Sequence, residues 1–91
     1  SMRVSIRLFG AFRQFQERDV LDLDVPDTET GSATVADVRR ALDTYALSHW
    51  RSYNAGLLRS SALATEDEFL RPTSAIPADG RLAVIPPVSG G

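Results

Sequence analysis

The chain has 91 residues, a formal net charge of −2, no cysteine and a single histidine. This length fits one domain with one hydrophobic core. The absence of cysteine excludes disulfides, thiolate metal centres and a cysteine nucleophile. All ten basic residues are arginines, and the absence of lysine excludes a Walker A phosphate loop and Schiff-base chemistry. The side chains are therefore poorly suited to covalent catalysis.

Charge and hydropathy also limit the expected partners. Nucleic-acid binding requires a basic stripe, and here the two signs of charge are interspersed along an acidic chain, so no nucleic-acid partner is expected. No apolar run approaches the roughly 18–20 residues that span a bilayer, and the N-terminus lacks the core of a signal peptide. We expect a cytoplasmic protein with no membrane partner, and we interpret Ser1, before Met2, as a scar of tag cleavage.

The first two expected elements are strands that form a hairpin. Over residues 3–9, Val4, Ile6 and Leu8 alternate with polar side chains, which is the period of a half-buried strand. The same alternation recurs over residues 19–25, where leucine and valine alternate with aspartate. Because the two segments follow one another with a short connection at residues 12–18, they predict an antiparallel pair.

The next expected element is the main helix, over about residues 34–47. Thr34 stands at the N-cap position and Asp37 follows three residues later, as in a capping box. Apolar side chains recur at helical spacing and predict one buried stripe, formed by Val35, Val38, Leu42 and Tyr45.

The second half of the chain predicts shorter elements. We expect a short helix or turn near residues 49–58, and short strands at 61–65 and 68–70. A loop at 72–80, anchored by Ile76, precedes a last strand at 81–85.

This order of elements predicts the α+β class, with a mixed sheet of about four to five strands packed on one main helix. The last strand fits most economically beside the first and parallel to it, which is the β-grasp, or ubiquitin-like, arrangement. We expect a single domain over residues 2–91, whose last six residues, 86–91, form a tail.

Conventional catalytic and metal sites are weakly supported. His49 lacks the clustered partners of a zinc site and no nucleophile-elbow motif accompanies it, so a surface position beside Trp50 is expected. The acidic run Glu66-Asp67-Glu68 is typical of a solvated turn rather than of a cation site. No metal site is therefore predicted.

The tail has features that a frayed terminus does not require. A chain ends in Gly-Gly by chance in about 0.5% of cases, given average glycine usage. Pro86-Pro87 fixes two φ angles, and the small residues after it fit a channel too narrow for ordinary side chains. Such a tail can present its terminal carboxylate to another protein.

The segment from Arg81 to Gly91, RLAVIPPVSGG, resembles the C-terminus of the small subunit of molybdopterin synthase, within the ubiquitin-like sulfur-carrier family. The related thiamine carriers share Gly-Gly but usually lack the Pro-Pro-Val-x-Gly-Gly form. The remaining elements fit the family in order, although the turns at Glu66-Asp67 and at 78–81 depart from its usual sequences.

The resemblance implies a mechanism centred on Gly91, with Gly90 before it. An ATP-dependent, E1-like enzyme would adenylate the Gly91 carboxylate, and sulfur from a persulfide donor would convert it to a thiocarboxylate. Residues 86–89 (Pro86, Pro87, Val88 and Ser89) would enter the large subunit of molybdopterin synthase, which supplies the catalytic side chains. The chain itself would bind no cofactor and act as a sulfur-donating subunit.

Strand phase adds a candidate partner surface. Phe9, Phe69 and Ile85 fall on the polar phase of their strands, so they are expected to face outward and form one patch. All three match the partner-facing patch of the resembling family, and Arg13, with Arg7, is expected at its rim. The alternative is that Phe12 or Phe15 folds over the sheet and covers the patch.

Other functions remain open at this point. The acceptor of the sulfur can be a thiazole, a cysteine or a tungsten-pterin precursor instead. A second class is a protein modifier conjugated through Gly91 to lysines of other proteins, and a third is a β-grasp interaction module with an inert tail.

Overall fold

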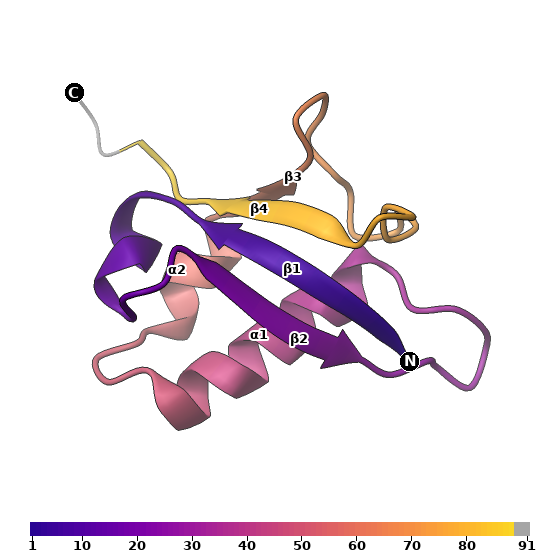
Figure 1. The fold of residues 1–91 in the computed structure, drawn as a ribbon, viewed down its shortest axis with the longest axis horizontal. Coiled ribbons are helices and arrows are strands. Elements are labelled where there is room, and N and C mark those ends of the chain that lie inside the picture. The colour runs from indigo at the N-terminus through magenta and orange to yellow at the C-terminus, as the bar shows by residue number, and fades with distance from the viewer. Residues whose placement is uncertain (89–91) are drawn as a thin grey trace.

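The computed structural model describes residues 1–88 and contains one four-stranded sheet with helices on one face (Figure 1). Its elements, in chain order, are β1 (Met2–Leu8), the 3₁₀ helix η1 (Gly10–Gln14), β2 (Val20–Val25), α1 (Val35–His49), α2 (Ala55–Arg59), β3 (Ala62–Ala64) and β4 (Arg81–Ile85). The architecture is α+β, with a mixed sheet and one main helix, as the sequence predicted.

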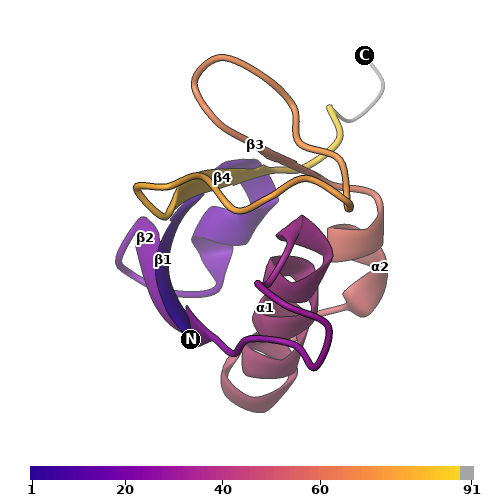
Figure 2. The same ribbon diagram turned by 90° about the vertical axis from the view of Figure 1, so that its right-hand side faces the viewer.

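The sheet has the order β2-β1-β4-β3. β1 pairs with β2 antiparallel, with Ile6 opposite Leu21. β1 pairs with β4 in parallel, with Leu8 opposite Val84, which confirms that the last strand lies beside the first. Because the chain between these two parallel strands crosses over through α1, the helix covers one face of the sheet (Figure 2).

The alternation of β1 sends Val4, Ile6 and Leu8 into the core, where all three are buried. The stripe of α1 meets them with Val35, Val38, Leu42 and Ala46, which are also buried, whereas the predicted stripe residue Tyr45 is only partly buried at its margin. Burial of such aliphatic side chains is the main favourable term in folding.

One end of the core is aromatic. Phe12, on η1, is fully buried, and Phe15 stacks on Trp50 with ring centroids 4.9 Å apart. The indole Nε1–H of Trp50 donates to Gln16 Oε1 at 3.2 Å, which satisfies the polar atom of this buried ring. The connection after β1 is therefore a core element, which the sequence pattern did not indicate.

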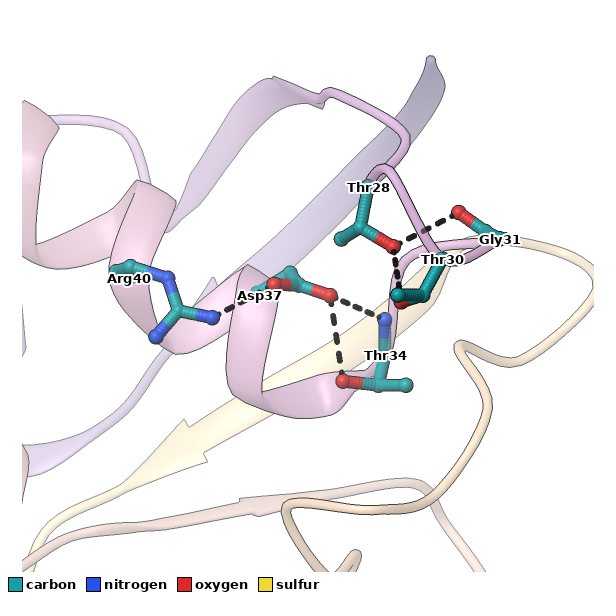
Figure 3. A network of polar contacts seen from close by, with 6 residues as sticks. All are labelled: Thr28, Thr30, Gly31, Thr34, Asp37 and Arg40. Atoms are coloured by element: carbon teal, nitrogen blue, oxygen red, sulfur yellow. Dashed lines mark hydrogen bonds and ion pairs between the residues drawn. The ribbon is translucent and has the colours of Figure 1, made fainter.

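The N-terminus of α1 carries the predicted cap (Figure 3). The N–H of Thr34 donates to Asp37 Oδ2 at 2.7 Å, and Arg40 Nη2 donates to Asp37 Oδ1 at 2.7 Å. The Thr34 hydrogen bond, followed by that of Arg40, lowers the pKa of the Asp37 carboxyl below its ordinary value. In the turn before the helix, Thr28 Oγ1 donates to the carbonyl of Gly31 at 3.0 Å.

Of two expectations for the second half, one was wrong and one was confirmed. The predicted strand at 68–70 is a single bridge between Phe69 and Ala64, and a turn follows at residues 72–73. The predicted helix or turn near 49–58 is a turn followed by α2, whose N-terminus is capped by Asn54 Oδ1, an acceptor for the N–H of Gly56 at 2.7 Å. β1 also ends at Leu8 rather than at Phe9.

The entry into β4 depends on a glycine. Gly80 has φ +71°, and a Cβ there would lie 2.5 Å from the carbonyl oxygen of Arg3. The Gly80 carbonyl in turn accepts from the N–H of Ser5 at 2.8 Å. This close approach sets the register in which β4 joins β1.

Candidate functional site

We call the face of the sheet that is turned away from α1 the outer face. The register of the paired strands determines which residues of the predicted patch lie on it. Across the strands, Arg7 of β1 lies beside Val20 of β2 and Ala83 of β4, and Ala83 lies opposite Ala64 of β3. Phe69 continues this row through its bridge to Ala64. Paired residues share a face, so Phe69 lies on the outer face.

A second row lies two residues, about 7 Å, further along the strands. Phe9 and Ile85 directly follow the paired residues Leu8 and Val84, and Ile85 lies opposite Ala62 of β3. The outer face near the ends of β1 and β4 thus carries Phe9, Ile85 and Phe69, which we call the apolar patch. Phe9 is 43% exposed, Phe69 is 71% exposed and Ile85 is half-buried.

The other half of the outer face is polar. Arg3 Nη1 pairs with Asp24 Oδ2 at 3.2 Å, and Ser5 Oγ donates to Asp22 Oδ1 at 2.7 Å. These residues lie toward the start of β1, whereas the apolar patch lies where β1 and β4 end. The outer face therefore changes from polar to apolar along the strands, in the direction of the tail.

A tight turn holds Phe69 on this face. The N–H of Thr65 donates to the Glu68 carbonyl at 2.9 Å, and the N–H of Leu70 donates to the Leu63 carbonyl at 2.8 Å. Thr65 Oγ1 accepts from the N–H groups of Asp67 and Glu68, each at 3.2 Å. Figure 2 shows this hairpin rising from the side of the sheet opposite α1. The acidic residues are therefore turn residues that position Phe69.

Phe12 and Phe15 do not cover the apolar patch. Both pack against Trp50 in the aromatic end of the core, Phe12 with its ring centroid 6.4 Å from that of Trp50. The alternative in which one of them folds over the outer face is wrong, because their place after β1 is at the end of the core rather than above the sheet.

Residues 86–88 continue from the end of β4, near the connection that follows β1 (Figure 1). Pro86 is half-buried, Pro87 is exposed and Val88 is 94% exposed. Gly10, with φ +54°, lies against Pro86, since a Cβ built on Gly10 would be 2.7 Å from Pro86 Cγ. Sequence reasoning missed this contact. The predicted residues Ser89, Gly90 and Gly91 lie outside the described residues.

The predicted rim arginines are both exposed. Arg7 lies on the outer face next to Ala83, and Arg13 lies on η1 after Gly10. Within residues 1–88 neither forms an ion pair, whereas Arg3, Arg18 and Arg40 do.

The remaining candidates lie elsewhere. His49 is exposed at the end of α1, where its ring stacks on Tyr45 and its Nδ1–H donates to the Tyr45 carbonyl at 3.0 Å. No group of three or more metal-ligating side chains occurs in the part of the chain that the structure describes. Among residues 1–88 no helix is long and apolar enough to cross a membrane.

The sheet order, the parallel pairing of β1 with β4 and the single packed helix define the class of ubiquitin-like β-grasp proteins. A model of the ThiS family matches residues 6–91, and the chain belongs to this family of ubiquitin-like sulfur carriers. The match includes every residue of the apolar patch and the whole tail.

A solved structure supports the fold. The chain is similar to SAMP1 from Haloferax volcanii, with a TM-score of 0.65 and 23% sequence identity over 99% of this chain and 100% of that chain. No curated protein matched the chain. Carriers of the ThiS type work with E1-like activating enzymes and with partner subunits.

Proposed function

We propose that the chain is the small, sulfur-donating subunit of a molybdopterin synthase. The observation that carries the proposal is the position of the apolar patch at the base of the tail. Phe9 and Ile85 are the residues that immediately precede Gly10 and Pro86, so a partner that binds the patch also meets the tail.

The chemistry takes place at the Gly91 carboxylate. A carboxylate oxygen attacks the α-phosphorus of ATP on an activating enzyme, and pyrophosphate leaves. The terminal sulfur of a persulfide then attacks the acyl carbon and displaces AMP, and a second thiol cleaves the sulfur–sulfur bond. The product is a thiocarboxylate, whose sulfur is a strong nucleophile.

This chain supplies the carboxylate that carries the sulfur and the surface that the partners bind. The chain contains no cysteine or lysine, so thiol-nucleophile and Schiff-base chemistry is assigned to the partners. The Pro-Pro-Val-Ser-Gly-Gly form of residues 86–91 supports molybdopterin synthase over a thiamine carrier as the context. ATP and the persulfide are substrates of the activating partners and need no site on this chain.

Intact-mass spectrometry tests the proposal. The chain is incubated with a cognate adenylating enzyme, ATP and a sulfur source, and it should gain the mass that replacement of one oxygen by one sulfur produces. Deletion of Gly91 should abolish the gain and leave the melting temperature unchanged. No gain in the full chain, with an enzyme that is active on a control carrier, would refute the proposal.

The choice of acceptor needs a second measurement. A stable complex with a molybdopterin synthase large subunit, weakened by changes in the apolar patch, would support that acceptor over thiazole, cysteine or tungsten-pterin synthesis. Covalent adducts of Gly91 with lysines of other proteins would instead support a role as protein modifier. The chain itself offers no lysine for such adducts.

A further inference from the structure

Gly10 and Pro86 form a contact that only glycine permits. The backbone of Gly10 has φ +54°, a region that L side chains rarely adopt. A Cβ at this position would also lie 2.7 Å from Pro86 Cγ and 3.4 Å from Pro86 Cδ. Both the backbone conformation and the limited space at position 10 therefore require a residue without a side chain.

The contact constrains the backbone of the tail. The ring of Pro86 is closed on its own main-chain nitrogen, so the ring cannot rotate away without moving the backbone of the tail. Pro87 follows directly, and a residue before proline is restricted to extended conformations. The first residues after β4 thus form a stiff segment whose direction is set at its base.

The same contact links the tail to the apolar patch. Gly10 directly follows Phe9, and Pro86 directly follows Ile85, while Phe9 and Ile85 themselves follow the paired residues Leu8 and Val84. The direction in which the tail leaves the domain is therefore fixed relative to the apolar patch. A partner bound to the patch meets the tail in that direction. Such preorganisation reduces the ordering that must occur after docking.

We infer that Gly10 is a positioning residue, the seat on which the Pro86 ring rests and which aims the tail into the active site of a docked partner. This inference rests on the proposed function of the tail. It assigns to η1 and to the exit of β4 a role in the reaction that is separate from binding affinity. The reaction should then depend on the seat through kcat rather than through KM.

The test compares steady-state adenylation, followed by pyrophosphate release, for the full chain and for variants at both sides of the contact. Gly10→Ala and Pro86→Ala should each lower kcat about tenfold while KM changes by less than about twofold. Gly31→Ala is the matched control for glycine, because Gly31 has φ +140° but no atom within 4 Å of a built Cβ. It should leave both constants unchanged.

A double-mutant comparison separates the seat from proline stiffness. Gly10→Ala combined with Pro86→Ala should be no slower than Pro86→Ala alone, because the ring that the added methyl displaces is already absent. Gly10→Ala combined with Pro87→Ala should instead show losses that multiply. The inference would be overturned if the two double variants showed the same dependence of kcat on Gly10→Ala. It would also be overturned if only KM changed, or if Gly10→Ala had the same kcat as Gly31→Ala.

A readout without a partner separates this inference from the proposed function. In the ¹⁵N-labelled chain, the order parameter of the Val88 N–H, the first amide after the two prolines, should be lower in Gly10→Ala and Pro86→Ala than in the wild type. If the wild-type chain is not adenylated at all, the proposed function fails, and the Val88 order parameter alone then decides whether the seat exists. An unchanged order parameter in both variants contradicts the seat.

Discussion

Phe9 shows how a single residue acquires a surface role from the period of a strand. It lies one position beyond β1, in the phase of Arg7 rather than of Leu8, so its ring faces outward. Its exposed fraction of 43% is large for an aromatic side chain, and Ile85 follows Val84, the strand partner of Leu8. Exposed aromatic side chains next to aliphatic ones are typical anchors of protein interfaces.

Phe9→Asp should therefore weaken binding to the partner without unfolding the chain. We expect a Kd about 30-fold higher, or ~2 kcal/mol, as for loss of an aromatic anchor. Isothermal titration with the large subunit measures the affinity, and thermal melting checks the fold. Leu47→Asp is the control, because Leu47 is 62% exposed but lies on α1, away from the outer face. Equal losses of affinity in the two variants would show that the apolar patch is not part of the interface.

Gly80 has a structural role instead. Gly80→Ala should lower the free energy of unfolding by about 2–4 kcal/mol, because its φ of +71° is strained for alanine and the added Cβ meets the Arg3 carbonyl. Gly31→Ala, which adds strain without a contact, should cost about 1–2 kcal/mol. Urea titration of both variants measures the difference, and equal costs would mean that the Arg3 contact is relieved without penalty.

For single residues, the sequence predicts the face of the strand on which a side chain lies better than it predicts long-range contacts. The alternation around Phe9 indicated its outward orientation, since the period of a strand is a local property. The contact of Gly10 with Pro86 could not be predicted from the sequence, which shows only a glycine after an expected strand. Pro86 is 76 positions away in the chain, and the contact depends on the parallel pairing of β1 with β4.

Among the elements, α1 depends on its N-terminal cap. The pKa of Asp37 is held below its ordinary value of 3.8 by the Thr34 hydrogen bond and by Arg40, so the ionised carboxylate stabilises the folded state. That contribution is present above the ordinary carboxyl pKa and is lost as the pH falls through the lower, folded value.

Asp37→Asn should therefore lower the melting temperature at neutral pH, and the difference from the wild type should shrink at acidic pH, below the ordinary carboxyl range. Melting curves collected across this range measure the effect. A difference that is independent of pH would show that the charge of Asp37 does not stabilise the cap.

The short helix η1 is a second element with a measurable contribution. Phe12 is fully buried and packs against both Phe15 and Trp50, so Phe12→Ala should cost about 3–5 kcal/mol through lost burial and a residual cavity. Chemical denaturation measures this cost. A cost below about 1 kcal/mol would mean that η1 packs loosely on the core.

The elements that the sequence predicted well are those with long, regular periods. The hairpin of β1 and β2, the helix α1 and the strand β4 all carry an apolar period with clear ends. The bridge at Phe69 and the five-residue helix α2 are too short for a period to distinguish them from neighbouring turns. Their conformations depend on tertiary contacts, such as the hydrogen bonds from Arg39 to the carbonyls of Leu58 and Ser61 at 2.6 and 2.7 Å.

The two ends of the sheet differ in surface chemistry. The start of β1 lies at one end of the sheet and the exit of β4 at the other (Figure 1). The polar pairs of the outer face lie toward the first end and the apolar patch toward the second. A chain without cysteine or lysine fits this arrangement, because in the proposed function it is loaded and unloaded by other enzymes. The domain then has to supply only a stable body, a contact surface and a directed tail.

In the proposed function the chain delivers sulfur from Gly91 to a pterin precursor, and a single-turnover transfer tests this delivery most directly. The thiocarboxylated chain is mixed with a molybdopterin synthase large subunit and the precursor, and both masses are followed by mass spectrometry. We predict that the chain returns to the mass of its carboxylate form as the precursor gains sulfur. A loaded chain that keeps its sulfur, with a large subunit that is active toward a control carrier, would contradict the proposed function.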